Sequence, residues 1–443
     1  MRRFVYPLIF GIAIILVGLI LSYNFYVGYL YLTQSPGDLG GDGPDYIQIA
    51  ASIAKTGHFG HLSRGVNSIL RELNQGVFLT NTHEFLGHHT WRPPIWPFFL
   101  AIIFSVFKYG LFAAHIFKFL IIILGGMLFY KTLKKIDLPH YLSLLGAFAY
   151  LIHPALQIYS RTFLSEPFTL FMMTLVLYTY VVYWQNKKTL TLIVLGVTSG
   201  LLVLTHPFYV FLPPLLIFIQ WLYQRLPFRN LIIGALSFVM VVSFWLTRNY
   251  MLYDQSGVFL TTSSGAVMAK GWNKDVLDLH NNVDGDLADE GLVLLPEDKE
   301  IFWSGNELER SQLYQKRTFE FIEGHQNLIF PIIVKKLKSA FNPFREKPKP
   351  GVLQTLNEVH RVLALICLAL VLLFSKNKLI KTLGWTIVGA TIFITVLTYS
   401  GLRFRTGQVP IELLLIFWSI DFVYKRFKPA PQNAPLPDRV GKK

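Results

Sequence analysis

The sequence predicts an all-α polytopic membrane protein with about ten transmembrane helices and a small mixed domain on its outer face. The 443-residue chain is 53% hydrophobic, has a mean hydropathy of +0.44 and carries only 15% charged residues, whereas soluble domains carry about 25%. Long apolar runs recur along the chain, each near the ~20 residues that a bilayer requires. The net charge of +15 comes from short basic clusters between these runs. That distribution is typical of cytoplasmic loops and not of a surface that binds nucleic acid.

The apolar runs define the expected spans. They are residues 7–30, 111–130, 141–158, 167–184, 190–206, 207–223, 229–247, 358–374, 379–399 and 408–424. The first run follows Arg2 and Arg3 as in a signal peptide, but no small-residue cleavage site comes after it. We therefore expect it to remain as an uncleaved first span.

A shorter apolar piece at residues 95–107 decides the topology. If it crossed the bilayer, every later segment would change sides, and the basic clusters from Lys131 onward would lie opposite Arg2 and Arg3. We expect it to be interfacial or re-entrant, which places all basic clusters inside. The chain is then a multi-pass protein of the cell membrane (inner or plasma membrane), with its site on the periplasmic or extracellular face.

This topology divides the chain into four parts. They are an N-terminal transmembrane module at 1–247 that includes a first outer loop at 32–110, an extracytoplasmic domain at 248–357, C-terminal transmembrane helices at 358–428, and a proline-rich cytoplasmic tail at 429–443 that is expected to be disordered. In the extracytoplasmic domain we expect a strand or hairpin around 257–269 and helices near 307–324 and 328–341. Charges are nearly absent from the span interiors and gather at the outer ends. Because a transporter or proton pump is expected to bury ionisable groups near the midplane, this pattern favours a site at the outer interface.

Acidic candidates stand at the start of two outer segments. Asp42 and Asp45 lie in the run Gly-Gly-Asp-Gly-Pro-Asp-Tyr at 40–46, where Pro44 and the following apolar spacing predict the start of a helix. Asp42 either caps this helix, with Asp45 as a first-turn acid, or acts as general base on an acceptor hydroxyl just outside the membrane. Glu166, before Pro167, is either a first-turn acid or a second carboxylate of the site.

Three arginines are candidates for binding a phosphate. Arg92 precedes two prolines, which hold it on extended backbone, so it either meets a phosphate or anchors the interface between two tryptophans. Arg403 and Arg405 are two residues apart and are expected on one side of an extended loop, beside the helix N-terminus opened by Pro410. Since this loop lies outside, the positive-inside rule does not explain these charges.

Other residues and motifs give weaker indications of a functional site. His206 either lines a headgroup pocket or packs. The cluster of His83, Glu84, His88 and His89 lacks the spacing of an H-E-x-x-H metal site, so we expect no metal there. The lone Cys367 is expected to pack in an apolar run. The chain has no glycine-rich phosphate loop and no G-x-S-x-G motif, so nucleotide hydrolysis and serine acyl transfer lack support.

These motifs together resemble the GT-C membrane glycosyltransferases of the protein O-mannosyltransferase and lipid A aminoarabinose transferase type. The resemblance includes, in order, the acidic motif at 42–46 with its helix ending in Thr56-Gly57, Arg92 before Pro93-Pro94, Leu164 to Pro167, Gly200 to Pro207, Trp245 to Tyr250 with its Arg248-Asn249 pair, and Arg403 to Pro410. Two positions depart from the family pattern. Gly43 stands where an acid is usual, and His206 stands where many relatives have arginine.

The resemblance implies a function and a set of site residues. A sugar would pass from a polyprenyl-phosphate donor to a glycan, lipid or protein acceptor with inversion, in a protein surrounded by membrane lipids and without nucleic acid. The implied site has Asp42 as base with Asp45 and Glu166 as further acids, Arg92, Arg403 and Arg405 on the donor phosphate, and Tyr46, His206 and Arg248 in the substrate pocket. Glu166 would orient the acceptor or hold a divalent metal ion; no other cofactor is implied. Three alternatives remain open: a lipid-carrier or polysaccharide flippase, a non-catalytic membrane assembly protein, and an O-antigen ligase or polymerase.

Overall fold

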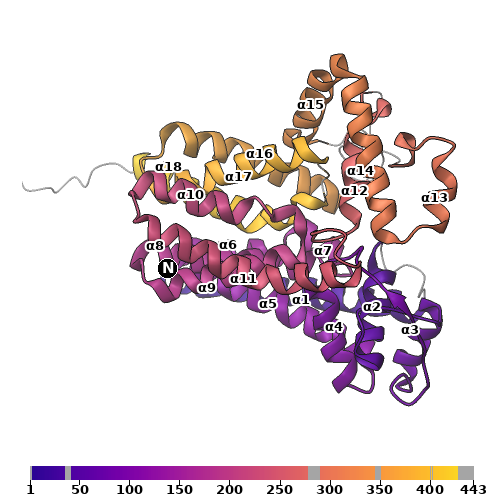
Figure 1. Ribbon diagram of the computed structural model, residues 1–443. Helices are drawn as coiled ribbons and strands as arrows, with labels where there is room; N and C mark the ends of the chain where they lie inside the picture. The colour runs from indigo at the N-terminus through magenta and orange to yellow at the C-terminus, as the bar shows by residue number, and fades with distance from the viewer. Residues whose placement is uncertain are drawn as a thin grey trace, which may run out of the picture.

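The computed structural model describes residues 2–34, 41–277, 290–344, 351–399, 401 and 403–427. A helix lies at each of the ten expected spans (Figure 1). These helices are α1 (Arg2–Gln34), α5 (Gly110–Lys135), α6 (His140–Leu151) continued by α7 (Pro154–Tyr159), α8 (Glu166–Asn186), α9 (Thr189–Thr205), α10 (Leu212–Gln224), α11 (Phe228–Leu252), α16 (Val352–Phe374), α17 (Lys378–Leu397) and α18 (Val409–Phe427). Eight spans among the described residues are long and apolar enough to cross a membrane, whereas α9 and α10 are shorter, with 17 and 13 residues. The expectation of a polytopic helical protein is confirmed, and the expected tail at 429–443 lies outside the described residues.

The two ends of the bundle differ in character. At one end the helices are joined by short turns that carry the basic clusters; for example, Lys187 between α8 and α9 and Arg225 after α10 adopt the left-handed conformation. At the other end lie the long connecting segments with α2, α3 and α12–α15 (Figure 1). We call this second end the outer end, after the expected topology.

The short apolar helix α4 (Ile95–Val106) begins and ends at the outer end. Near its start, Trp96 Nε1 donates to the Phe163 carbonyl 2.9 Å away. Just after its end, Lys108 and Tyr109 lie against Gly76, which ends α3 (Val66–Gln75). The expectation that this piece does not span the bilayer therefore agrees with its position.

The strand expected around 257–269 is wrong. Residues 263–271 form helix α12 (Ser263–Gly271), and the paired strands of the described residues are β1 (Gly60–Leu62) and β2 (Phe85–His88), an antiparallel pair in the first outer loop. Small residues explain the difference: Gly265 packs so closely on Ser311 of α14 that an added methyl group would overlap its carbonyl. This close helix–helix contact, which the local sequence does not show, favours the helix.

The rest of the region expected to be extracytoplasmic, residues 248–357, is also helical where the structure describes it, and we keep the name extracytoplasmic domain for it. It contains the 3-10 helices η2 (Lys274–Val276) and η3 (Glu290–Val293) and the helices α13 (Asp298–Ser304), α14 (Glu307–Gly324) and α15 (Gln326–Phe341). Helix α14 starts with a capping box, in which the Asn306 side chain accepts from the Glu309 N–H and the Glu309 carboxylate accepts from the Asn306 N–H. Both helices expected in this region are confirmed.

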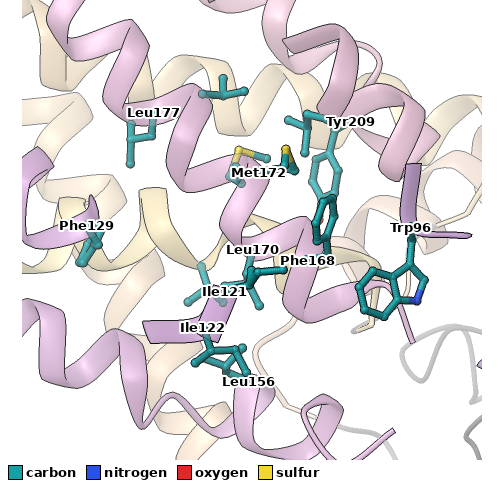
Figure 2. Close-up of a cluster of buried hydrophobic side chains, with 14 of the residues drawn as sticks. Trp96, Ile121, Ile122, Phe129, Leu156, Phe168, Leu170, Met172, Leu177 and Tyr209 are labelled. Carbon is teal, nitrogen blue, oxygen red and sulfur yellow. The ribbon is translucent and has the colours of Figure 1, made fainter. Parts of the chain in front are cut away.

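Helix α8 lies at the centre of the main apolar core. Its inward side chains pack among those of α5 and α7, with Tyr209 of the 3-10 helix η1 (Pro207–Tyr209) and Trp96 of α4 near its outer end (Figure 2). The labelled α8 residues are Phe168, Leu170, Met172 and Leu177. Because α8 begins at Glu166, this packing fixes the position of that carboxylate at the outer end of the bundle.

Candidate active site

Asp42 lies between two arginines that come from distant parts of the chain. It occupies the N-cap position of α2 (Gly43–Thr56), but its side chain makes no capping hydrogen bond. Instead, Arg403 Nη2 lies 2.6 Å from Asp42 Oδ2, and Arg92 Nη2 lies 2.8 Å from Asp42 Oδ1. The interpretation of Asp42 as a helix cap is therefore not what the structure shows.

Each arginine also binds a second carboxylate. Arg92 reaches Asp45 Oδ2 through Nη2 at 2.7 Å and through Nε at 2.9 Å. Arg403 forms an ion pair through Nε with Glu166 Oε1. Three carboxylates thus face two guanidinium groups, which leaves the cluster one negative charge when all five groups are ionised. We call these five residues the carboxylate–arginine cluster.

Local structure presents each of these side chains at the outer end. Pro44 occupies the first turn of α2, where its missing N–H is not needed, and α2 ends at Gly57 in the left-handed conformation. Pro93 and Pro94 follow Arg92 directly and lead into α4. Arg403 precedes the 3-10 helix η4 (Phe404–Gln408), which runs into α18.

The charges of the cluster keep Asp42 ionised. Burial alone would raise the pKa of Asp42, but the positive charges of Arg403 and Arg92 outweigh it, so that the pKa lies below its ordinary value. Glu166 is almost completely buried at the first position of α8, where a carboxylate also faces the positive end of the helix.

Tyr46 and His206 border the cluster. The Tyr46 side chain is buried, its ring lies 5.9 Å below the Arg92 guanidinium, and its hydroxyl lies 3.4 Å from Ser165 Oγ. Burial and the neighbouring Asp42 raise the pKa of Tyr46 to about 12, so the hydroxyl keeps its proton. His206 packs against the rings of Tyr209 and Phe404, close enough to Arg403 and Asp42 to be affected by both charges.

Arg405 does not belong to the cluster, so the expectation that it shares one side with Arg403 is wrong. Residues 404–408 form η4 instead of an extended loop. With three residues per turn, side chains two positions apart diverge. Arg405 instead pairs with Glu412 at 3.4 Å and donates to the Ala340 carbonyl, in a buried group that includes His360. The Arg405 guanidinium is thus paired within the protein and does not face the carboxylate–arginine cluster.

Arg248 lines a groove at the outer end of α11. The groove has a volume of about 580 Å³ and is lined mainly by apolar side chains of α4, α9 and α11, among them Ile95 and Leu204. The Arg248 guanidinium donates to the carbonyls of Phe59 and His89 and lies over the Trp245 ring. No carboxylate of the described residues forms an ion pair with it. The groove therefore has apolar walls and, at its outer end, a guanidinium that is bound to carbonyls and lies close enough to Glu307 to be affected by its charge.

The described residues contain no group of three His, Cys, Asp or Glu side chains placed to hold a metal ion. The histidines weighed in the sequence have other partners: His83 pairs with Glu72 at 2.9 Å, and His89 pairs with Glu307 at 2.6 Å. A metal ion at Asp42 or Glu166 would first have to displace an arginine, so the residues present do not fit one there.

Sequence reasoning missed Glu307, which lies next to the cluster through Thr90 and His89. Its carboxylate contacts Thr90 and His89, which stand 217 and 218 positions earlier in the chain. The sequence around it shows only the start of a helix, so no local signal marks this role.

Residues 91–245 match the family model described as dolichyl-phosphate-mannose-protein mannosyltransferase. The expected resemblance to the GT-C membrane glycosyltransferases is confirmed. The matched stretch includes Arg92, Glu166 and His206, whereas Asp42 and Arg403 lie outside it. No curated protein sequence matches the chain significantly.

The solved structures to which the chain is similar include two proteins with 12% sequence identity to it. One is the oligosaccharyltransferase of Archaeoglobus fulgidus tethered to an acceptor peptide, with a TM-score of 0.46, where the match covers 93% of this chain and 50% of that protein. The other is ArnT from Cupriavidus metallidurans in the apo state, with a TM-score of 0.38 and coverage of 90% and 77%. The chain thus spans about half the length of the oligosaccharyltransferase.

Proposed function

We propose that this protein transfers a sugar from a polyprenyl-phosphate donor to an acceptor hydroxyl at the extracytoplasmic face of the membrane. The observation that supports this most strongly is the position of Asp42, a carboxylate held between Arg92 and Arg403 at the outer end of the bundle. A base and two cations side by side are what transfer from a phosphate leaving group needs. The coarse class, a GT-C membrane glycosyltransferase, agrees with the family match.

The groove at Arg248 suits the donor lipid. Its apolar walls favour a polyprenyl chain, and its guanidinium, which forms no ion pair with a carboxylate of the described residues, favours a phosphate. Pro94 and Ile95, which line the groove, follow Arg92 closely in the chain. The donor phosphate would therefore meet Arg248 and Arg92, with Arg403 beyond; Arg405 has no part in this proposal.

The reaction requires one bond to form and one to break. The acceptor oxygen attacks the anomeric carbon from the side opposite the phosphate, and its proton passes to Asp42. The bond between the anomeric carbon and the phosphate oxygen breaks, and the lipid phosphate leaves with the electron pair. The configuration is therefore inverted. Guanidinium groups stabilise the charge that grows on the phosphate, which is a larger effect in a site shielded from water.

Donor binding would also activate the base. In the structure the carboxylates of the cluster bind the arginines, and the lowered pKa makes Asp42 a weak base. A phosphate that competes for Arg92 and Arg403 releases Asp42 from these ion pairs and raises its proton affinity. Asp42 thus becomes an effective base when the donor is present.

A strain that lacks the gene, complemented with wild type or Asp42→Asn at equal protein level, tests the proposal. Mass spectrometry of envelope glycans and polyprenyl-phosphate sugars is expected to show one missing sugar modification and accumulation of its lipid-linked donor. Only the wild type is expected to restore the normal profile. Restoration by Asp42→Asn would favour a flippase. Restoration by both Asp42→Asn and Arg403→Ala would favour a non-catalytic assembly protein. A diphosphate-linked oligosaccharide in place of the accumulated donor would indicate a ligase or polymerase.

A further inference from the structure

One carboxylate of the extracytoplasmic domain, that of Glu307, binds the segment that carries Arg92. Glu307 Oε2 accepts from the backbone N–H of Thr90 at 2.7 Å and from the Thr90 hydroxyl at 2.8 Å. Thr90 is completely buried. Both bonds are charge-assisted, and such bonds are stronger than those between neutral groups.

The other groups of this segment are fixed from the same side. The Thr262 N–H, at the start of α12, donates to the Thr90 carbonyl at 3.0 Å, and Tyr253 Oη lies 2.8 Å from Thr90 Oγ1. His89 Nδ1 lies 2.6 Å from Glu307 Oε1. The backbone N–H and carbonyl of Thr90 are thus both bound to the extracytoplasmic domain, two residues before Arg92.

A second contact leads from the same place toward the cluster. The His61 ring stacks on the His89 ring with centroids 4.5 Å apart, and His61 is close enough to Asp45 and Arg92 to be affected by their charges. Two prolines directly after Arg92 restrict the backbone on its other side. Arg92 therefore has little freedom to move unless Thr90 moves.

We propose that Glu307 is a positioning residue, which sets the place of Arg92 between Asp42 and Asp45 by holding Thr90 and His89. This inference rests on the proposed function, because it assigns Glu307 to the same reaction. Glu307 touches neither the donor nor the acceptor in this proposal and acts only through Arg92. The extracytoplasmic domain thereby helps to position Arg92 in the active site.

A transfer assay with purified protein tests this inference. The donor is the polyprenyl-phosphate sugar and the acceptor is the envelope extract, both prepared from a strain that lacks the gene. Glu307→Ala is expected to lower kcat about 100-fold, the order of loss that a misplacement of about 1 Å causes, and to leave the acceptor KM unchanged. Glu307→Gln is expected to lose less, since its amide oxygen still accepts from Thr90. Glu323→Gln, an exposed residue of the same helix, is the matched control and is expected to behave as wild type.

The combination with Arg92→Lys separates positioning from general damage. If Glu307 acts through Arg92, adding Glu307→Ala to Arg92→Lys lowers kcat little further; if the two losses multiply, the inference is overturned. Wild-type turnover by Glu307→Ala would overturn it as well. If Glu307→Ala does not fold, Glu307→Asp, which keeps the charge but shortens the reach, takes its place. Absence of transfer by the wild type contradicts the proposed function itself and is thus a distinct result.

Discussion

At Asp42, one carboxylate bridges two guanidinium groups that are 311 residues apart in the chain. Side chains held this way are costly to separate, because removing one partner leaves a partly buried charge unpaired. A substrate that supplies its own negative charge at the same place keeps both guanidinium groups paired when the carboxylate is released. This arrangement of the cluster is therefore compatible with a phosphate-binding role.

The pH dependence of the reaction should reflect Asp42. Because its pKa is lowered, the carboxylate stays ionised until the pH falls below the ordinary aspartate value of 3.8. The stabilisation from its ion pairs is likewise present above that value and is lost as the pH falls through the lowered pKa. A pH profile of kcat/KM is expected to show no acid limb due to Asp42 above pH 3.8. A limb at pH 5 to 6 that moves in Asp42→Glu would contradict this.

Arg405 should matter for stability and not for donor binding. Removing one partner of a buried ion pair costs about 3–5 kcal/mol, so Arg405→Met is expected to lower the unfolding midpoint in detergent clearly. Exposed Arg71→Met, on α3, is the control and should have no effect. The donor KM of folded Arg405→Met should equal that of wild type. A raised donor KM with unchanged stability would return Arg405 to the phosphate site.

At the scale of elements, the extracytoplasmic domain also holds the C-terminal end of α17. Lys336 of α15 donates to the Val396 carbonyl at 2.9 Å and lies 4.1 Å from the centre of the Trp272 ring, and Trp272 Nε1 donates to the same carbonyl at 3.1 Å. The last carbonyls of a helix have no partner within it, and these two donors bind one of them. The loop to Arg403 begins directly after this contact, so both arginines of the cluster follow segments that the domain holds.

Gly271→Ala tests this contact. Gly271, the last residue of α12, lies against the Thr398 carbonyl, and an added methyl group would overlap its oxygen. Overpacking of this kind costs about 1–3 kcal/mol, so a lower unfolding midpoint and slower transfer are expected together. Gly257→Ala, in the same domain, has room for its methyl group and serves as control. Equal midpoints for the two variants would show that the contact is not tight.

At the scale of the whole molecule, the bundle brings together side chains from four distant segments at one end. The sequence predicted this gathering, because Asp42, Arg92, Glu166 and Arg403 all fall on one side of the expected topology. It also predicted the helices, since apolar runs of sufficient length have few alternatives in a membrane.

The errors come from contacts that the local sequence does not contain. The prediction that Arg405 lies beside Arg403 is wrong because residues 404–408 form η4. The predicted strand is wrong because Gly265 packs closely on Ser311, which favours helix α12. The sequence does not indicate a role for Glu307 because its partners Thr90 and His89 are more than 200 residues away. Pairing at that distance is decided by the tertiary fold.

Cysteine labelling in intact cells tests the topology. In a Cys367→Ser background, Ser304→Cys and Lys108→Cys are expected to react with a membrane-impermeant maleimide, and Lys187→Cys is not; all three positions are exposed. Lys108 follows α4, so its reaction from outside checks that α4 does not cross. Labelling of Lys187→Cys but not of Ser304→Cys would show that the protein has the opposite orientation in the membrane.

The most direct test of the central claim is turnover by purified Asp42→Asn with a polyprenyl-phosphate sugar from the deletion strain and its envelope extract as acceptor. Loss of a general base lowers the rate by about 10²- to 10⁴-fold, so a kcat reduced to this degree is expected, with donor binding retained or tightened because the arginines are released. The wild-type product should have inverted configuration. Wild-type turnover by Asp42→Asn, or a wild-type product of retained configuration, would contradict the claim that Asp42 is the base.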